Sequence, residues 1–383
     1  MSLYLIVLAM LVSFAVYEYR KGKTQKRLYA IAFFVLGVML CFRYAQGSDY
    51  YGYYVNYLLT PKIWQFKKLI SINIHGELGW KLLCAICRSF AMPFDMVVFF
   101  ISLFELYCIH RFVSRFCRLQ TVALLLMYPT LYLTYTFSAL RQGAVLLFFL
   151  GFMLEWFYRG KMRHYLIGTV ACITVHSSAL VFLVLFGLKI LVLDGKWALI
   201  LIALAAVGGI CAQWLLPKIS AVFITYANSS MSIVAIGERA VSLGIILYVF
   251  WDRLKDRKNR KFLDFLLQIY LYGAIIYAFL MWNALISARF NIYFKAVELM
   301  LFTAALKRPG RLPYVDIRVR DAVAVYLLAL SVVLYFKNIH SYLVQGSYYE
   351  GANVFNYPWL HIFDMDAAEV WRQIPYDFSK YLN

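Results

Sequence analysis

The chain has 383 residues, of which 63% are hydrophobic and only 15% are charged. Soluble domains contain about 45–50% apolar and about 25% charged residues, so this composition excludes an ordinary soluble globular protein. The formal net charge of +19 does not indicate nucleic-acid binding, because most basic residues stand in short loops between apolar runs. The sequence therefore predicts an all-α membrane protein that crosses the bilayer many times.

The basic loops set the expected topology. The first apolar run has no basic residue before it and is followed by the strongly basic segment 20–27, which is the reverse of a cleavable signal peptide. Because cytoplasmic loops are enriched in Lys and Arg, the amino terminus is expected outside. Further basic loops, all expected inside, stand at 111–118, 159–163, 189–196, 253–261 and 307–320.

A bilayer core of about 30 Å needs roughly 20 helical residues per crossing. With the basic loops inside, alternation of direction predicts a set of full spans. They are expected at 3–19, 28–44, 94–112, 119–137, 141–158, 197–215, 233–251, 263–283, 289–306 and 321–337.

The apolar run from His164 to Ile190 does not fit as a full span. It must begin and end inside, yet it is too short for two complete crossings and too long for one. Two short helices that meet at a polar turn solve this problem, and the polar cluster available for the turn is His176-Ser177-Ser178. Irregular backbone at membrane depth occurs where it lines a cavity, so His176 is a candidate site residue.

Neither a linker nor an internal repeat divides the chain. We expect a single transmembrane domain over 1–337, with about 11–12 transmembrane segments including the broken hairpin. The tail 338–383 is expected on the outer side, with a short amphipathic helix at 361–373. The remaining outer-face features are loops at 45–93 and 216–232 and a short helix at 79–91.

Several charged residues stand near the outer ends of the predicted spans, and ionisable residues in such helices are functional candidates. The arginines are Arg43, Arg141, Arg239 and Arg289. Any one of these arginines could instead contact lipid headgroups, as arginines near helix ends commonly do. Guanidinium groups also bind phosphate through paired hydrogen bonds. As a group, these arginines predict a binding site for a lipid-linked phosphate.

Other polar residues belong to the same outer constellation. Asp49 lies in the outer loop and His176 at the turn of the broken hairpin, while Gln142 and Glu238 are expected to contact the substrate. Tyrosines crowd the loop that contains Asp49, and we expect Tyr50, Tyr51 and Tyr54 to bind substrate. Interfacial belts explain many such tyrosines. Aromatic faces also bind sugars, so the combination with arginines favours a glycolipid over an ion.

The sequence predicts neither a metal nor a cofactor. Its seven cysteines lie within or beside apolar segments. The pair Cys84 and Cys87 has no second Cys or His pair to complete a zinc site, so packing is the better interpretation. The sequence contains no P-loop, no dinucleotide fingerprint and no metal-ligand spacing.

Five short motifs occur along the chain: FRYAQGSDYYGYY (42–54), ELGWKLL (77–83), FSALRQGAV (137–145), TVHSSALVF (174–182) and ARFNIYF (288–294). Their order resembles the EpsG-like branch of the Wzy-type polysaccharide polymerases, over about positions 28–306. ELGW stands where we associate Glu-Pro-Gly with the family, so the resemblance assigns no role to Glu77.

The resemblance implies a membrane glycosyltransferase of the GT-C type in the bacterial cytoplasmic membrane. Such proteins transfer the reducing end of a growing chain from undecaprenyl diphosphate to a sugar hydroxyl on another lipid-linked repeat unit, at the outer face. The implied partners are the undecaprenyl-diphosphate-linked oligosaccharide, membrane lipid and a chain-length regulator protein. The product is a surface polysaccharide such as O-antigen, capsule or exopolysaccharide.

If this reaction is correct, the predicted residues take specific roles. Arg141 and Arg289 bind the diphosphate, with Arg43 or Arg239 assisting, because the site must stabilise negative charge that develops on the leaving group. A base should remove the acceptor proton, and His176 and Asp49 are the two candidates. No metal is required, because the arginines supply the positive charge.

Two other functions use similar features. A flippase or transporter of the same lipid-linked sugar also has broken helices and intramembrane charges, although transporters commonly show inverted repeats and none is visible here. A membrane acyltransferase would use His176 as its base. An acyl donor taken from the cytoplasm favours an inward-facing site, which disagrees with the charge topology.

Overall fold

The computed structural model describes residues 2–47, 49–219, 231–255, 261–306, 317–345 and 352–363. Within these ranges the regular elements are helices, and β-pairing is limited to one bridge between Arg43 and His361. The prediction of an all-α, multi-pass membrane protein is confirmed. Most of the amphipathic helix expected at 361–373 lies outside the described residues.

Seven stretches of helix in the described part are long and apolar enough to cross a bilayer. One of them is interrupted by a π-helical segment, η3 (Phe149–Met153), between α8 (Leu140–Phe148) and α9 (Leu154–Tyr158). The others are α1 (Leu3–Lys21), α6 (Phe94–Phe116), α11 (Gly195–Ile219), α13 (Ile233–Lys255), α14 (Phe262–Leu280) and α17 (Ile317–Gln345). Helix α17 continues past the span end expected at 337.

Three further predicted spans are present as shorter or broken helices. The span expected at 28–44 corresponds to α2 (Lys26–Cys41), which has 16 residues. The spans expected at 119–137 and 289–306 each consist of two consecutive segments. These are α7 (Gln120–Met127) with the π-helical η2 (Tyr128–Thr136), and α15 (Ala284–Lys295) with α16 (Glu298–Ala305).

The run 164–190 forms the predicted broken hairpin. Helix α10 (Met162–Val175) ends at His176, whose backbone is extended, and the 3₁₀ helix η4 (Ser177–Lys189) begins directly afterwards. The two segments pack against each other, so the polar turn between them is held in one place.

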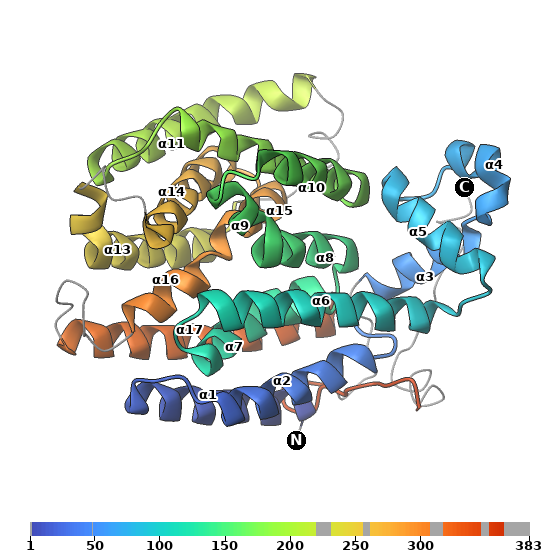
Figure 1. The fold of residues 1–383 in the computed structure, drawn as a ribbon, viewed down its shortest axis with the longest axis horizontal. Coiled ribbons are helices and arrows are strands. Elements are labelled where there is room, and N and C mark those ends of the chain that lie inside the picture. Colours follow the sequence, from blue (N-terminus) through green and yellow to red (C-terminus); the bar gives the residue numbers. More distant parts are fainter. Residues whose placement is uncertain are drawn as a thin grey trace.

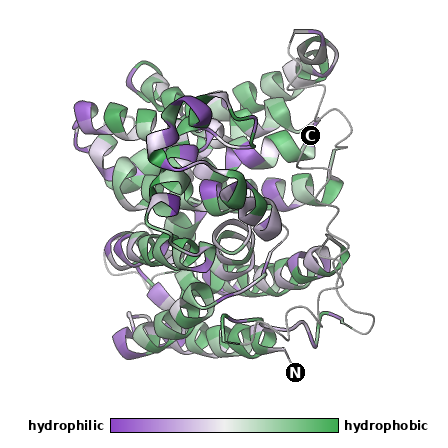
Figure 2. Cartoon of the chain, turned by 90° about the vertical axis from the view of Figure 1, so that its right-hand side faces the viewer, coloured by the Kyte–Doolittle hydropathy of each residue, from purple (hydrophilic) through white to green (hydrophobic). Residues whose placement is uncertain are grey.

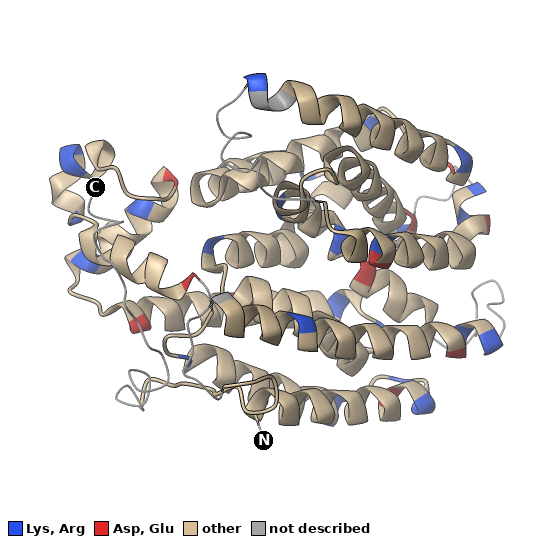
Figure 3. Cartoon of the chain, turned by 180° about the vertical axis from the view of Figure 1, so that it is seen from behind, with Lys and Arg blue, Asp and Glu red and all other residues tan. Residues whose placement is uncertain are grey.

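The long helices lie side by side, and the short helices gather at one end of the bundle (Figure 1). These are α3 (Tyr50–Leu59), η1 (Ile63–Gln65), α4 (Phe66–Ser71) and α5 (Leu78–Ser89). Helix α5 agrees with the short helix predicted at 79–91, whereas α3 and α4 were not anticipated. Seen from this end, the helices are mostly hydrophobic (Figure 2). Charged residues occur mainly toward the helix ends (Figure 3).

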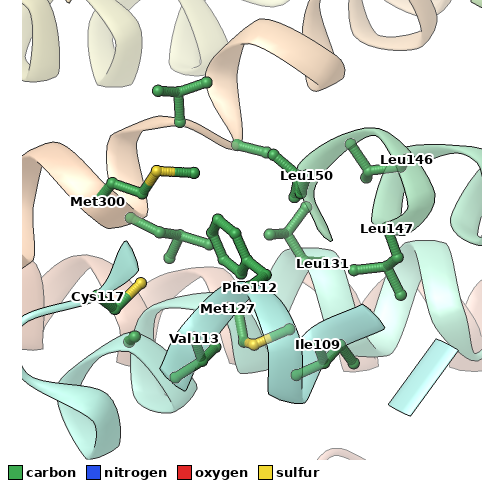
Figure 4. Close-up of a cluster of buried hydrophobic side chains, with 14 of the residues drawn as sticks. Ile109, Phe112, Val113, Cys117, Met127, Leu131, Leu146, Leu147, Leu150 and Met300 are labelled. Atoms are coloured by element: carbon green, nitrogen blue, oxygen red, sulfur yellow. The ribbon is translucent and has the colours of Figure 1, made fainter. Parts of the chain in front are cut away.

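Close packing of apolar side chains holds the middle of the bundle together. Phe112 of α6, at 0% exposure, lies among side chains of neighbouring helices, including Met127, Leu131, Leu150 and Met300 (Figure 4). In a lipid environment such helix contacts are stabilised by van der Waals packing instead of water exclusion. The core therefore supplies a rigid frame for the polar groups at its ends.

A buried carboxylate fixes α1 to α7. Glu18 is fully buried, and its Oε2 accepts from the backbone N–H groups of Thr121 (2.8 Å) and Val122 (3.1 Å) and from the Thr121 hydroxyl (2.7 Å). These amides belong to the first turn of α7, whose N–H groups have no partner within the helix. An acidic group at this position also suits the helix dipole.

The segment 352–363 returns to the beginning of the chain. Backbone hydrogen bonds connect Ser2 N–H to the Phe355 carbonyl (2.7 Å) and Tyr44 N–H to the Leu360 carbonyl (2.9 Å). The stretch before Asp49 is therefore supported by residues more than 300 positions later.

The topology can be tested by labelling cysteines with an impermeant thiol reagent. In a Cys211→Ser background, Ser177→Cys should react only from the outer side, because the hairpin turn lies at the same end as α3–α5. Lys161→Cys, in a basic loop at the opposite end, serves as the control and should react only from the cytoplasm. Labelling of Ser177→Cys from the cytoplasm would contradict the assigned orientation.

Candidate functional site

The candidate site is organised by one carboxylate. Glu77, just before α5, forms an ion pair with Arg141 Nη1, and its other oxygen accepts from the Ser177 backbone N–H at 2.8 Å. Arg141 lies in the first turn of α8 and is 5% exposed, while Ser177 is at the hairpin turn. Three segments distant in sequence therefore meet at Glu77.

Glycines in the quoted motifs permit this convergence. A Cβ on Gly79 would lie 2.4 Å from Thr174 Oγ1, so α5 can approach the end of α10 only with glycine at this position. A Cβ on Gly143 would lie 2.3 Å from the Tyr135 carbonyl oxygen, where α8 turns back against η2. These motif glycines thus place Glu77 and Arg141 by close backbone packing.

The charges around Glu77 determine its ionisation. Partial burial alone would raise the pKa of the Glu77 carboxyl, but the Ser177 amide and the Arg141 guanidinium outweigh it and lower the pKa below its usual value. Burial lowers the pKa of the neighbouring His75 imidazole, and the guanidinium groups of Arg141 and Arg289 lower it further. The positive charges of Arg141 and Arg289 therefore both reach the His75 side chain.

The hydrogen bonds of His176 define its tautomer. Its Nδ1 accepts from the Ser178 backbone N–H at 3.3 Å and lies 2.7 Å from Ser178 Oγ. A nitrogen that accepts from an N–H carries no proton itself, so the neutral ring is assigned its proton on Nε2. The Ser178 hydroxyl is held in turn by the buried Tyr293 hydroxyl at 2.7 Å. His176 therefore presents a donor, Nε2–H.

Gln142 links this histidine to the second arginine. Its side-chain amide donates to the Arg289 backbone carbonyl at 2.8 Å. It also hydrogen-bonds the Tyr293 hydroxyl. Gln142 is 4% exposed and connects α8 to α15 through these contacts, and its expected contact with substrate stays a prediction.

Asp49 lies at the exposed edge of the same site. It precedes α3, and its backbone N–H donates to Ser138 Oγ at 3.4 Å. The carboxylate is an electrostatic neighbour of His75 and Tyr53. We call the set His75, Glu77, Arg141, His176, Arg289 and Asp49 the outer cluster.

The tyrosines are arranged differently from the expectation. Tyr53 faces the site, with its ring 5.5 Å from the Arg141 guanidinium carbon. Tyr50 is buried and donates to Asp95, and the rings of Tyr51 and Tyr54 pack against Tyr50 and Phe94 respectively. Tyr50 and Tyr53 lie three positions apart on one face of α3 and belong to the same buried cluster, in which the Tyr53 ring is next to Trp80 and Arg141. Binding of substrate by Tyr50, Tyr51 and Tyr54 stays a prediction.

Arg43 is buried and binds residues of neighbouring helices. It is 1% exposed, and its guanidinium donates to Ser102 Oγ (2.7 Å) and the Thr136 carbonyl (3.0 Å) and lies over the Phe137 ring. These contacts hold α2 against α6 and η2. We therefore place Arg43 in the core, although its buried Nε–H, like that of Arg141, has no hydrogen-bond partner among the described residues.

Glu238 and Arg239 belong to a separate group. Both Glu238 oxygens accept from Lys295 Nζ, at 2.6 and 2.7 Å. Arg239 donates to Asn291 and lies over the Tyr277 ring at 4.1 Å. We call Glu238, Arg239, Asn291, Lys295 and Glu298 the second cluster.

Sequence reasoning missed four residues that shape the outer cluster: His75, Glu77, Ser178 and Tyr293. Glu77, Ser178 and Tyr293 stand within the quoted motifs, and Ser178 also belongs to the polar turn predicted at 176–178. Their partners lie 64 to 115 positions away, so pairing was not visible in the sequence. In the described part of the chain, no group of three or more His, Cys, Asp or Glu side chains is arranged to hold a metal ion.

The fold and the site define a multi-pass membrane protein with a polar, arginine-containing site at one end of its helices. The chain belongs to the EpsG family, whose family model matches residues 26–357. This family assigns it to the membrane proteins of polysaccharide biosynthesis. No curated protein and no solved structure matches the chain.

The Glu77 junction predicts a defined pH dependence. We expect Glu77→Gln to destabilise the protein at pH 7 by about 1–3 kcal/mol, because buried Arg141 loses its carboxylate partner. A carboxyl with a lowered folded pKa stabilises above its usual pKa of about 4.3 and loses this effect as the pH falls through the lowered value. The difference in melting temperature should therefore shrink below about pH 4.

The matched control is Asp252→Asn, which removes an exposed ion pair with Lys255. It should change the melting temperature little at any pH. A Glu77→Gln difference of the same size at neutral and acidic pH would contradict an ionised Glu77 in this junction.

Proposed function

We propose that this member of the EpsG family is a metal-independent glycosyltransferase that polymerises undecaprenyl-diphosphate-linked oligosaccharide repeat units. The site works at the outer face of the bacterial cytoplasmic membrane, with a chain-length regulator protein as a further partner. The supporting observation is the state of Arg141. Its Nε–H is buried and has no hydrogen-bond partner among the described residues, although Nη1 is paired with Glu77.

An unsatisfied donor on a buried guanidinium is costly. A phosphate oxygen satisfies it and adds a charge-assisted hydrogen bond. Because Arg141 and Arg289 both act on His75 and His176, a diphosphate beside these histidines would be neutralised by two guanidinium groups. Membrane lipids that carry a diphosphate and an oligosaccharide fit this charge and the polysaccharide role of the family.

The reaction joins two sugars without an external energy source. The acceptor hydroxyl oxygen forms a bond to the anomeric carbon of the donor, and the bond from that carbon to the diphosphate oxygen breaks. The electron pair stays on the diphosphate, and the acceptor proton passes to a base and then to water. The protein must therefore stabilise the leaving diphosphate and hold the acceptor in line.

The hydrogen bonds favour a division of roles between the two base candidates. Nδ1 of His176 is occupied by Ser178, and Nε2 carries a proton, so the ring is arranged to donate to a leaving oxygen. Asp49 is an exposed residue whose carboxylate, like the Arg141 guanidinium, acts on Tyr53, and it can accept the hydroxyl proton. We therefore assign the base to Asp49 and a leaving-group contact to His176.

The function as a whole is tested in cells. A strain that lacks this chain should still make lipid-linked single repeat units on the outer side but no long polymer. A flippase would instead leave the single units on the cytoplasmic side. Gel analysis of the glycolipid, with the repeat unit accessible or inaccessible to an external glycosidase, separates the two outcomes.

The arginines are tested by a change that keeps the charge. Arg141→Lys and Arg289→Lys should each lose most polymerisation while expression stays near normal, because an ammonium group lacks the planar fork that binds two phosphate oxygens. Arg118→Lys, at an exposed loop position, is the matched control. Near-normal polymer from both site variants would argue against diphosphate binding, and loss of the protein itself would indicate a purely structural role.

The base assignment is tested in purified protein by measuring donor affinity and transfer rate separately. Asp49→Asn should slow transfer by about 10²–10⁴-fold with donor affinity unchanged, as expected for loss of a positioned base. His176→Ala should weaken donor binding as well as transfer. Intact donor binding with a dead His176→Ala, beside an active Asp49→Asn, would reverse the assignment.

A further inference from the structure

Four residues of the second cluster line a cavity that has no role in the proposed reaction: Arg239, Asn291, Lys295 and Glu298. This cavity has a volume of about 170 Å³ and lies between α11, α13, α14, α15 and the start of α16. Its walls include small and apolar residues such as Ala206, Ala240, Ala274 and Ala278, and its polar residues are Arg239, Asn291, Lys295 and Glu298. The cavity therefore combines an apolar part with a charged part.

The apolar part borders the outer surface of the bundle. On α11, Val207 follows the wall residue Ala206 and is 62% exposed; on α13, Val241 follows Ala240 and is 49% exposed. Exposed apolar side chains on spanning helices face lipid. A hydrocarbon chain can thus reach the cavity from the membrane between α11 and α13.

The charges in the cavity are unequally satisfied. Lys295 is paired with Glu238, and Glu298 hydrogen-bonds Tyr270. Arg239 has the Asn291 amide oxygen and the Tyr277 ring, but no carboxylate forms an ion pair with it in the described ranges. Its Nε–H is buried and lacks a hydrogen-bond partner there. Arg239 is therefore a cation with room for an anionic partner.

The position of Arg239 relates it to the outer cluster. Tyr135 has both Arg239 and Arg289 as electrostatic neighbours, and its hydroxyl lies 3.5 Å from the Ala288 carbonyl. The two guanidinium groups thus act on one tyrosine while belonging to different sites. Arg289 lies with Arg141 and His176, whereas Arg239 lies in the cavity.

We infer that this cavity binds the phosphate end of a polyprenyl lipid, with the phosphate on Arg239 and the first isoprenoid units against α11 and α13. The inference rests on the proposed function, since a polymerase must hold two lipid-linked chains at once. The outer cluster then holds the leaving diphosphate, and the cavity anchors the second lipid. Tyr135 is the partition between the two phosphates.

The test counts lipids bound to the purified full chain by native mass spectrometry, with undecaprenyl phosphate as the probe. The wild type should bind two molecules. Arg239→Gln and Arg141→Gln should each bind one, with affinity at the lost site reduced about 10- to 100-fold. Lys255→Gln, an exposed residue on the same helix as Arg239, is the control and should bind two.

A second pair of variants guards against misfolding of Arg239→Gln. Ala206→Leu fills the cavity without touching the arginine and should also remove one lipid, whereas Val207→Leu faces the membrane and should not. Wild-type binding by both Arg239→Gln and Ala206→Leu would overturn the inference. Equal occupancy by phosphatidylglycerol, with the same dependence on Arg239, would overturn the assignment to a polyprenyl lipid.

This assay does not depend on turnover. Two bound lipids with no polymerase activity would support the cavity and count against the proposed function alone. Normal polymerisation by a protein that binds only one lipid would support the proposed function and contradict the lipid site in the cavity.

Discussion

The ion pair between Glu77 and Arg141 is the interaction on which the rest of the site depends. Arg141 is almost fully buried at the start of α8, where an uncompensated charge would be costly. Glu77 compensates it and uses its second oxygen to hold the amide of Ser177. One carboxylate thus sets the position of α5, the start of α8 and the hairpin turn. The same junction brings Arg289 and His176 near Arg141. Gln142 holds the Arg289 backbone, and Tyr293 holds the Ser178 hydroxyl that contacts His176.

Much of the architecture follows from simple features of the sequence. Basic loops and span lengths predicted the succession of helices, and the mismatch in length at 164–190 predicted the break at His176. Arg141, Arg289, His176 and Asp49 were expected together, and they share one locality because each stands at the same end of its helix. Helix ends are visible in a sequence, since apolar runs stop there. Side-chain partners are not.

Arg43 and Glu77 show where this reasoning ends. Both are charged residues at the same end of the bundle, yet backbone carbonyls and a serine hydroxyl accept from the two terminal nitrogens of Arg43. Nothing near Arg43 in the chain reveals Thr136 as its partner. Glu77 showed no feature of its own, and its importance arises from residues 64 and 100 positions away. The tyrosines of α3 show the same limit, because the helix packs both Tyr50 and Tyr53 into one small core and the sequence does not reveal that the Tyr53 ring lies against Arg141.

The return of residues 352–363 to the start of the chain has a consequence for biogenesis. The backbone of Tyr44, a few residues before Asp49, is bonded to Leu360, and Ser2 is bonded to Phe355. During synthesis the first two helices enter the membrane long before these partners exist. The backbone that leads to Asp49 can therefore gain these hydrogen bonds only after α17, which precedes both partners in the chain, has been made. A chain that stops before α17 would have its first two helices in the membrane without the segment that fastens them to each other in the complete protein.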